Sequence, residues 1–128
     1  MFAPLYLSNY CVNGCVYCPY HAKNKHIRRK KPHTGGNCQR GNGFAGYGHK
    51  RLALETGEDP VNNPIEYVLE SIQTIYSIKH KNGAIRRVNV NIAATTVENY
   101  RRLKDAGIGT YILFQETYHK ESYERLHP

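Results

Sequence analysis

The sequence predicts an α/β protein whose core is a parallel β-sheet of about four strands connected by crossover helices. Short apolar segments alternate along the chain with segments whose apolar residues recur at helical spacing. Polar or cysteine-rich residues follow directly after each predicted strand, and parallel strands end at one edge of a sheet, where ligands bind. The 128 residues suffice for one domain, residues 1–128, and a hydrophobic share of 40% allows a core.

The first predicted strand, residues 2–9, leads straight into a cysteine loop. Three of the four cysteines lie there in the pattern C-x-x-x-C-x-x-C, as Cys11, Cys15 and Cys18. Thiolates this close together can all turn toward one metal centre. Three are one short of a closed zinc site, but they suit a [4Fe–4S] cluster that keeps one iron open.

Other interpretations of this spacing stay open. A zinc site could take His21 or His26 as its fourth ligand, the cysteines could form a disulfide, or the spacing could be accidental. A secreted disulfide scaffold would spread its cysteines along the chain, so the spacing favours metal.

Charge and hydropathy limit the expected partners. Much of the net charge of +8 lies in residues 23–31, but no aromatic platform accompanies this basic run, so we expect a solvated face and no nucleic-acid partner. No apolar run approaches the roughly 20 residues of a membrane span. Residues 1–4 lack the features of a signal peptide, so we expect a cytoplasmic protein with reduced thiols and no membrane partner.

Residues 32–48 interrupt the pattern. This segment is rich in glycine, contains one proline and has no apolar period, so neither a helix nor a strand is favoured. The sequence therefore predicts an irregular segment in place of the first crossover helix.

Regular structure resumes after this segment. We expect a strand over residues 51–56 that ends in Gly57-Glu58. The best helix of the chain follows, with Asn63 as its cap, Pro64 at its first position, Glu66 completing a capping box, and Gly83 as its stop.

The last part of the chain alternates in the same way. We expect a strand over residues 87–92 and then a helix that Thr95 and Glu98 open, that runs to about residue 104 and that Gly107 and Gly109 close. The continuous apolar run 110–114 predicts a strand covered on both faces, and residues 120–126 a short final helix.

Three segments together resemble the radical S-adenosylmethionine (SAM) enzymes, whose signature is C-x-x-x-C-x-aromatic-C after the first strand and Gly-Glu after the second. The segments are LYLSNYCVNGCVYCPYHAKNKHI, KRLALETGEDP and IRRVNVNIAATTVENYRRLKDAGIGTYILFQETYH. Within the family they look like the tyrosine lyases that mature [FeFe]-hydrogenase, with the thiamine-pathway 2-iminoacetate synthases as close relatives. The match covers nearly all of the chain except residues 32–47, and it implies a partial (β/α) TIM-type barrel, an N-terminal fragment of the whole enzyme.

The resemblance also implies roles for individual residues. The three cysteines would hold the cluster, SAM would bind its open iron, Tyr17 would lie near the adenine, and Gly57 would present Glu58 to the SAM amino group. Ribose or substrate contacts on the same face are expected from Asn91, Gln115 and Glu116. Solvated or outer positions are expected for His21, His26 and His119.

The implied parent reaction is radical cleavage of tyrosine. A 5′-deoxyadenosyl radical would lead to rupture of the Cα–Cβ bond, giving p-cresol and dehydroglycine, toward CO and cyanide for the hydrogenase cofactor. The alternatives are 2-iminoacetate synthesis for thiamine, or a small zinc- or iron-binding module with a basic arm for RNA or a protein. We expect this chain to be inactive alone and to need a missing C-terminal half or self-association.

The resemblance also implies an amphipathic helix of equal length where residues 32–48 lie. Plausible codons for that helix, read one base out of frame, give residues 32–47. A compensated frameshift is therefore our hypothesis for the glycine content and for Cys38.

Overall fold

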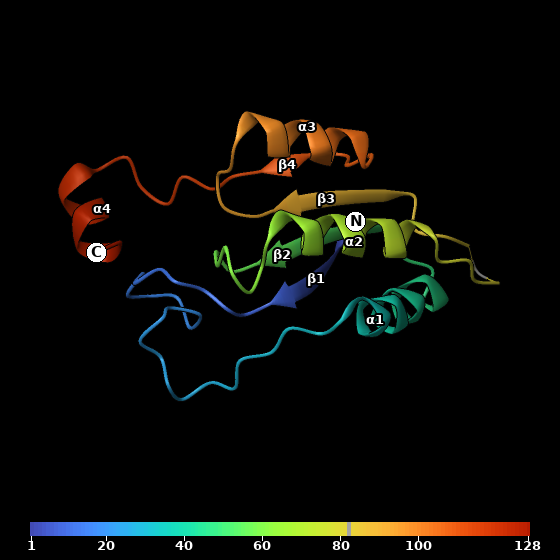
Figure 1. Ribbon diagram of the computed structural model, residues 1–128, viewed down its shortest axis with the longest axis horizontal. Helices are drawn as coiled ribbons and strands as arrows, with labels where there is room; N and C mark the ends of the chain where they lie inside the picture. Colours follow the sequence, from blue (N-terminus) through green and yellow to red (C-terminus); the bar gives the residue numbers. More distant parts are fainter. Residues whose placement is uncertain (82) are drawn as a thin grey trace.

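A computed structural model describes residues 1–81 and 83–128 (Figure 1). The element order alternates strand and helix throughout, as β1 Ala3–Ser8, α1 Thr34–Gly46, β2 Arg51–Thr56, α2 Ile65–Tyr76, β3 Arg87–Asn91, α3 Val97–Asp105, β4 Tyr111–Ile112 and α4 Lys120–Leu126. No helix among the described residues is long and apolar enough to cross a membrane.

The four strands form one parallel sheet in the order β1-β2-β3-β4, which confirms the predicted fold class. The arrowheads in Figure 1 all point toward the end of the sheet where α4 lies. The predicted strand 110–114 is wrong in extent, because only Tyr111 and Ile112 pair with β3, and Leu113 and Phe114 are exposed. β4 is last in the strand order, so β3 is its one neighbour in the sheet.

The apolar core lies on one face of the sheet. Side chains alternate between faces along a strand, and the alternate residues on one face are fully buried: Leu5, Leu7, Leu52, Leu54, Val88 and Val90. They pack against Val68, Ile72, Ile75 and Leu103 of the helices. On the opposite face Tyr6 is 47% exposed, so the described helices cover one side of the sheet.

The prediction that residues 32–48 are irregular is wrong, because α1 occupies this segment. His33 caps the helix by accepting a hydrogen bond from the Gly36 amide. The buried Asn37 amide donates to the hydroxyl of Tyr67 (3.1 Å) and to that of Ser71 (3.2 Å). These contacts with α2 supply what the local sequence lacks, since tertiary packing routinely overrides propensity.

Glycine serves the packing of α1 at one position. A Cβ atom on Gly41 would overlap the Ile78 side chain, so its absence lets the helix lie close to the segment after α2. The helix is weakly amphipathic, and its buried residues are small or polar. The frameshift idea concerns the coding sequence and stays a hypothesis.

The helix ends differ from the predicted caps by short distances. Pro64 takes the N-cap position of α2, while the Asn63 side chain donates to the backbone carbonyls of Tyr10 and Gly57 instead of capping. α2 ends at Tyr76, well before Gly83. Thr96, one residue later than predicted, caps α3. Gly107 ends α3 as predicted, with a φ of 82° that favours glycine.

Substitution of two glycines by alanine tests the helical state of residues 34–46. At both Gly43 and Gly48 an added Cβ atom would meet no neighbouring atom within 4 Å, but only Gly48 has a positive φ, of 84°, which strains other residues. We expect Gly43→Ala to raise the free energy of unfolding by about 0.5–1 kcal/mol, as in a helix interior, and Gly48→Ala to lower it. Urea unfolding measures both, and no gain from Gly43→Ala would contradict the helix.

Candidate functional site: a cysteine-lined cavity at the carboxyl edge of the sheet

A cavity of about 640 Å³ lies at the carboxyl ends of the strands. Its walls come from the cysteine loop after β1, the ends of β2, β3 and β4, and α4. The structure brings together there every residue proposed above for cluster, cofactor or ligand binding: Cys11, Cys15, Cys18, Tyr17, Gly57, Glu58, Asn91, Gln115 and Glu116.

The end of β2 holds the beginning of the cysteine loop. A Cβ atom on Gly57 would overlap the carbonyl oxygen of Tyr10 and lie 2.9 Å from Cys11 Cβ, so only glycine allows this approach. The Gly57 amide donates to the Ser8 carbonyl (3.2 Å), and the Val12 amide donates to the Glu58 carbonyl (2.8 Å). The backbone thus fixes Cys11 beside Glu58.

The Glu58 carboxylate is exposed but oriented. Its Oε2 accepts a hydrogen bond of 2.6 Å from the Asn13 side-chain amide inside the cysteine loop. Asn13 is tied in turn to the far side of the loop, because its carbonyl accepts from the Ala22 amide (2.8 Å). The loop and the carboxylate therefore hold each other in place.

Arg29 closes the segment that contains the cysteines. Its guanidinium donates to four backbone carbonyls, those of Asn9 (2.6 Å), Tyr20 (2.7 Å), His21 (2.7 Å) and Asn24 (3.3 Å). Asn9 precedes the loop and the other three follow it, so one side chain joins its two ends. This role was not predicted, because the basic run 23–31 is typical of a solvated face and no local signal marks Arg29.

α4 forms the last wall of the cavity, at the end of the sheet where the cysteine loop also lies (Figure 1). The Tyr17 hydroxyl lies 2.8 Å from His127 Nε2, and the Val16 amide donates to the Leu126 carbonyl (3.0 Å). His127 was not predicted either, since a histidine just beyond a short helix belongs to no recognised motif.

The cavity is acidic although the chain is basic. Its described lining includes Glu55, Glu58 and Glu116 and no lysine or arginine. Burial raises the pKa of the Cys15 thiol, and negative charge on the other two thiols and on Glu116 raises it further, against a backbone hydrogen bond that lowers it. The three thiols thus share one electrostatic environment, which would stabilise a cation.

Within the described part of the chain, the three thiols line one cavity without converging on a single metal position. All three are free, half-buried and in the wall of one cavity. Among the described residues, however, no three His, Cys, Asp or Glu side chains are placed to hold one metal ion. A four-iron cluster takes each thiolate on a different iron, so the sulfur atoms need not converge on one point as around zinc.

The histidines considered earlier lie elsewhere. His21, His26 and His119 are absent from the described cavity lining, and His119 instead caps α4 by accepting from the Ser122 amide. The zinc interpretation with His21 or His26 as fourth ligand therefore gains no support.

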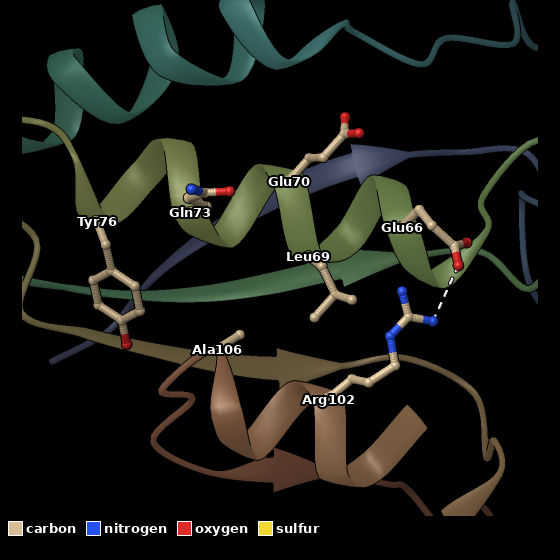
Figure 2. A pocket seen from close by; sticks show the side chains of 7 residues that line it. All are labelled: Glu66, Leu69, Glu70, Gln73, Tyr76, Arg102 and Ala106. Carbon is tan, nitrogen blue, oxygen red and sulfur yellow. Dashed lines mark hydrogen bonds and ion pairs between the residues drawn. The ribbon is translucent and has the colours of Figure 1, made fainter. Parts of the chain in front are cut away.

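A second hollow, of about 470 Å³, lies between α2 and α3 on the outer side (Figure 2). Arg102 reaches across it to Glu66, with 3.0 Å between guanidinium and carboxylate. It contains none of the residues predicted for the site, so the chemistry-bearing residues gather in the cysteine-lined cavity.

Several known proteins resemble this chain in sequence. No family model matches the sequence. Among curated proteins, the 2-iminoacetate synthase of Salmonella typhimurium is 30% identical over 126 residues, which cover 98% of this chain and 32% of that protein. The [FeFe] hydrogenase maturase subunit HydE of Thermotoga maritima is 28% identical over 121 residues, which cover 94% of this chain and 33% of that protein.

Two solved structures are more similar. HydG, a maturase of the [FeFe]-hydrogenase, is 61% identical with a TM-score of 0.96 over 99% of this chain and 28% of that chain. The chain is a relative of the radical SAM enzymes. HydG from Carboxydothermus hydrogenoformans is 43% identical with a TM-score of 0.90, over 98% of this chain and 28% of that chain. The radical SAM resemblance and the partial TIM-type barrel are thus confirmed, and the chain spans about a third or less of each relative.

The Arg29 contacts predict a stability difference between two neighbouring arginines. Arg29→Lys keeps the charge but loses the planar fork that reaches four carbonyls, so we expect the free energy of unfolding to fall by about 2 kcal/mol. Arg28→Lys, at an exposed side chain, should change it by less than about 0.5 kcal/mol. Equal effects in urea unfolding would show that the Arg29 fork is not important for the loop.

Proposed function

We propose that this chain is the cluster- and SAM-binding segment of a radical SAM lyase that cleaves tyrosine. The observation that carries the proposal is the meeting of Cys11, Cys15, Cys18 and Glu58 in one acidic cavity at the carboxyl edge of a parallel sheet. The radical SAM relatives imply a [4Fe–4S] cluster and SAM as its cofactors.

Each residue group has a separate task in this proposal. The three thiolates hold the cluster. Glu58, fixed by Asn13 at 2.6 Å, accepts hydrogen bonds from the ammonium group of SAM. The acidic wall that includes Glu116 favours a cationic sulfonium ligand in the cavity.

The remaining predicted residues line the same cavity and complete the binding surface. Tyr17 supplies an aromatic side chain beside Cys18, and Asn91, Gln115 and Glu116 supply polar groups for ribose or substrate. Gln115 already donates from its side chain to the Thr117 carbonyl (2.8 Å), which orients its amide. When bound, the cluster supplies the electron that splits SAM to a 5′-deoxyadenosyl radical, and these residues position the ligand for that step.

Tyrosine cleavage toward p-cresol and dehydroglycine is the activity we assign to the parent enzyme. The 61% identity with HydG favours the hydrogenase-maturation branch over the 2-iminoacetate synthases, for which the curated relative is 30% identical. In the hydrogenase branch the second product leads on to CO and cyanide.

The alternative of a small metal-binding module with a basic RNA-binding arm is less well supported. Arg29 is occupied by four carbonyls, and the Lys31 ammonium lies 4.5 Å above the Tyr67 ring. The charge of Arg29 is therefore engaged within the protein and cannot freely contact phosphates, whereas Lys31 is exposed.

Iron loading of single cysteine variants tests the proposed cofactor. After anaerobic reconstitution we expect about four irons per chain and a spectrum that changes when SAM is added. Cys11→Ala, Cys15→Ala and Cys18→Ala should each lose the cluster, whereas Cys38→Ala, on α1 and outside the cavity lining, should keep it. A brown Cys15→Ala protein would refute the assignment, and so would an unsubstituted chain that is colourless and loaded with zinc.

The isolated chain should not cleave tyrosine. Exposed Leu113 and Phe114 border the cavity, so water reaches its interior, and water exclusion is needed to protect a reactive radical. We expect at most slow reductive SAM cleavage, seen as 5′-deoxyadenosine by chromatography, without p-cresol. Formation of p-cresol at the rate of a whole HydG would show that four strands suffice.

A further inference from the structure

The contact between α4 and the cysteine loop is used by none of the roles assigned above. It consists of the Val16–Leu126 backbone hydrogen bond (3.0 Å) and the Tyr17–His127 side-chain contact (2.8 Å). The His127 ring also meets two aromatic rings, edge-on to Tyr17 at 5.4 Å and stacked on Tyr123 at 4.3 Å. These interactions join segments about 110 residues apart in sequence, at the wall of one cavity.

The hydrogen bonds of His127 show which group donates in its contact with Tyr17. Nδ1 lies 3.2 Å from the Tyr123 carbonyl, which can only accept, so Nδ1 carries the proton. In the neutral ring Nε2 is then an acceptor, and the Tyr17 hydroxyl donates to it.

The position of the contact within the loop gives it a consequence. Val16 and Tyr17 are the two residues between Cys15 and Cys18, and the Cys18 amide donates to the Cys15 carbonyl (3.2 Å). Fixing Val16 and Tyr17 from α4 therefore fixes the turn that spaces these two thiols. Cys11, in contrast, is held from the other side by Gly57 and Glu58.

We propose that His127 is a positioning residue that acts through Tyr17 to hold Cys15 and Cys18 in the cavity wall before any ligand binds. The relevance of this positioning to iron binding rests on the proposed function. The positioning itself is a property of the metal-free chain and can be measured there.

Alkylation rates of single cysteines in the metal-free, reduced chain test the proposal. Iodoacetamide labelling followed by peptide mass spectrometry gives one rate for each cysteine. In His127→Ala we expect Cys15 and Cys18 to react about three- to tenfold faster, the range that follows from losing one hydrogen bond. The rate of Cys38, on α1, should stay unchanged and serves as the internal control.

Companion variants separate positioning from general loosening of the fold. Tyr17→Phe should reproduce the acceleration, and the double variant should add nothing to it, because both substitutions break one interaction. His127→Gln, which offers an amide oxygen as acceptor, should restore the parent rates. Tyr47→Phe removes a hydroxyl at an 88% exposed position and should change no rate.

Several results would overturn the proposal. Parent-like rates for Cys15 and Cys18 in His127→Ala would do so, and so would additive effects in the double variant. Acceleration of Cys38 as well would indicate global loosening and equally reject a specific role. Iron binding in the presence of a chelator separates the positioning role of His127 from the proposed cofactor. If neither the unsubstituted chain nor any variant takes up iron, the proposed cofactor is rejected, while the labelling result still decides the role of His127.

Discussion

The close approach of β2 to the cysteine loop at Gly57 is the constraint on which the site depends. Any side chain there would overlap the Tyr10 carbonyl, and the loop would move away from the sheet. Because no Cβ intervenes, the Val12 amide reaches the Glu58 carbonyl, and Asn63 can bind the carbonyls of both segments. The backbone contacts thus hold Cys11 beside Glu58, and the Asn13 side chain then orients the Glu58 carboxylate.

The loop must also satisfy its polar backbone groups without forming regular structure. Arg29 meets this requirement with four hydrogen bonds to carbonyls, and Asn9 pairs through its side chain with the backbone of Arg28 and Lys30. The positive charge of Arg29 therefore lies outside the cavity lining, which the carboxylates and thiols form. A chain with a net charge of +8 can therefore present an acidic cavity to a cationic ligand.

The sequence predicted the parts of this arrangement that depend on local pattern. Alternating periods gave the strand and helix order, and residues after parallel strands necessarily meet at one edge, so Cys11, Glu58 and Asn91 were placed together correctly. Three features escaped because they depend on contacts between distant segments. The α1 helix forms through Asn37 and its partners on α2, and Arg29 and His127 act on the loop from positions with no motif of their own. Composition reports average propensity, whereas these contacts depend on single side chains.

The two faces of the sheet divide the work between folding and binding. Leu5, Leu54 and Val90 are fully buried under the helices. Their neighbours on the strands form a row across the other face, where Tyr6 pairs in register with Glu55 and Glu55 with Asn91, and all three line the cavity. A shift of one residue in register would exchange the two sets, placing a carboxylate in the core and leucines in the cavity. The buried row therefore fixes the register, and the register in turn fixes which polar groups line the cavity.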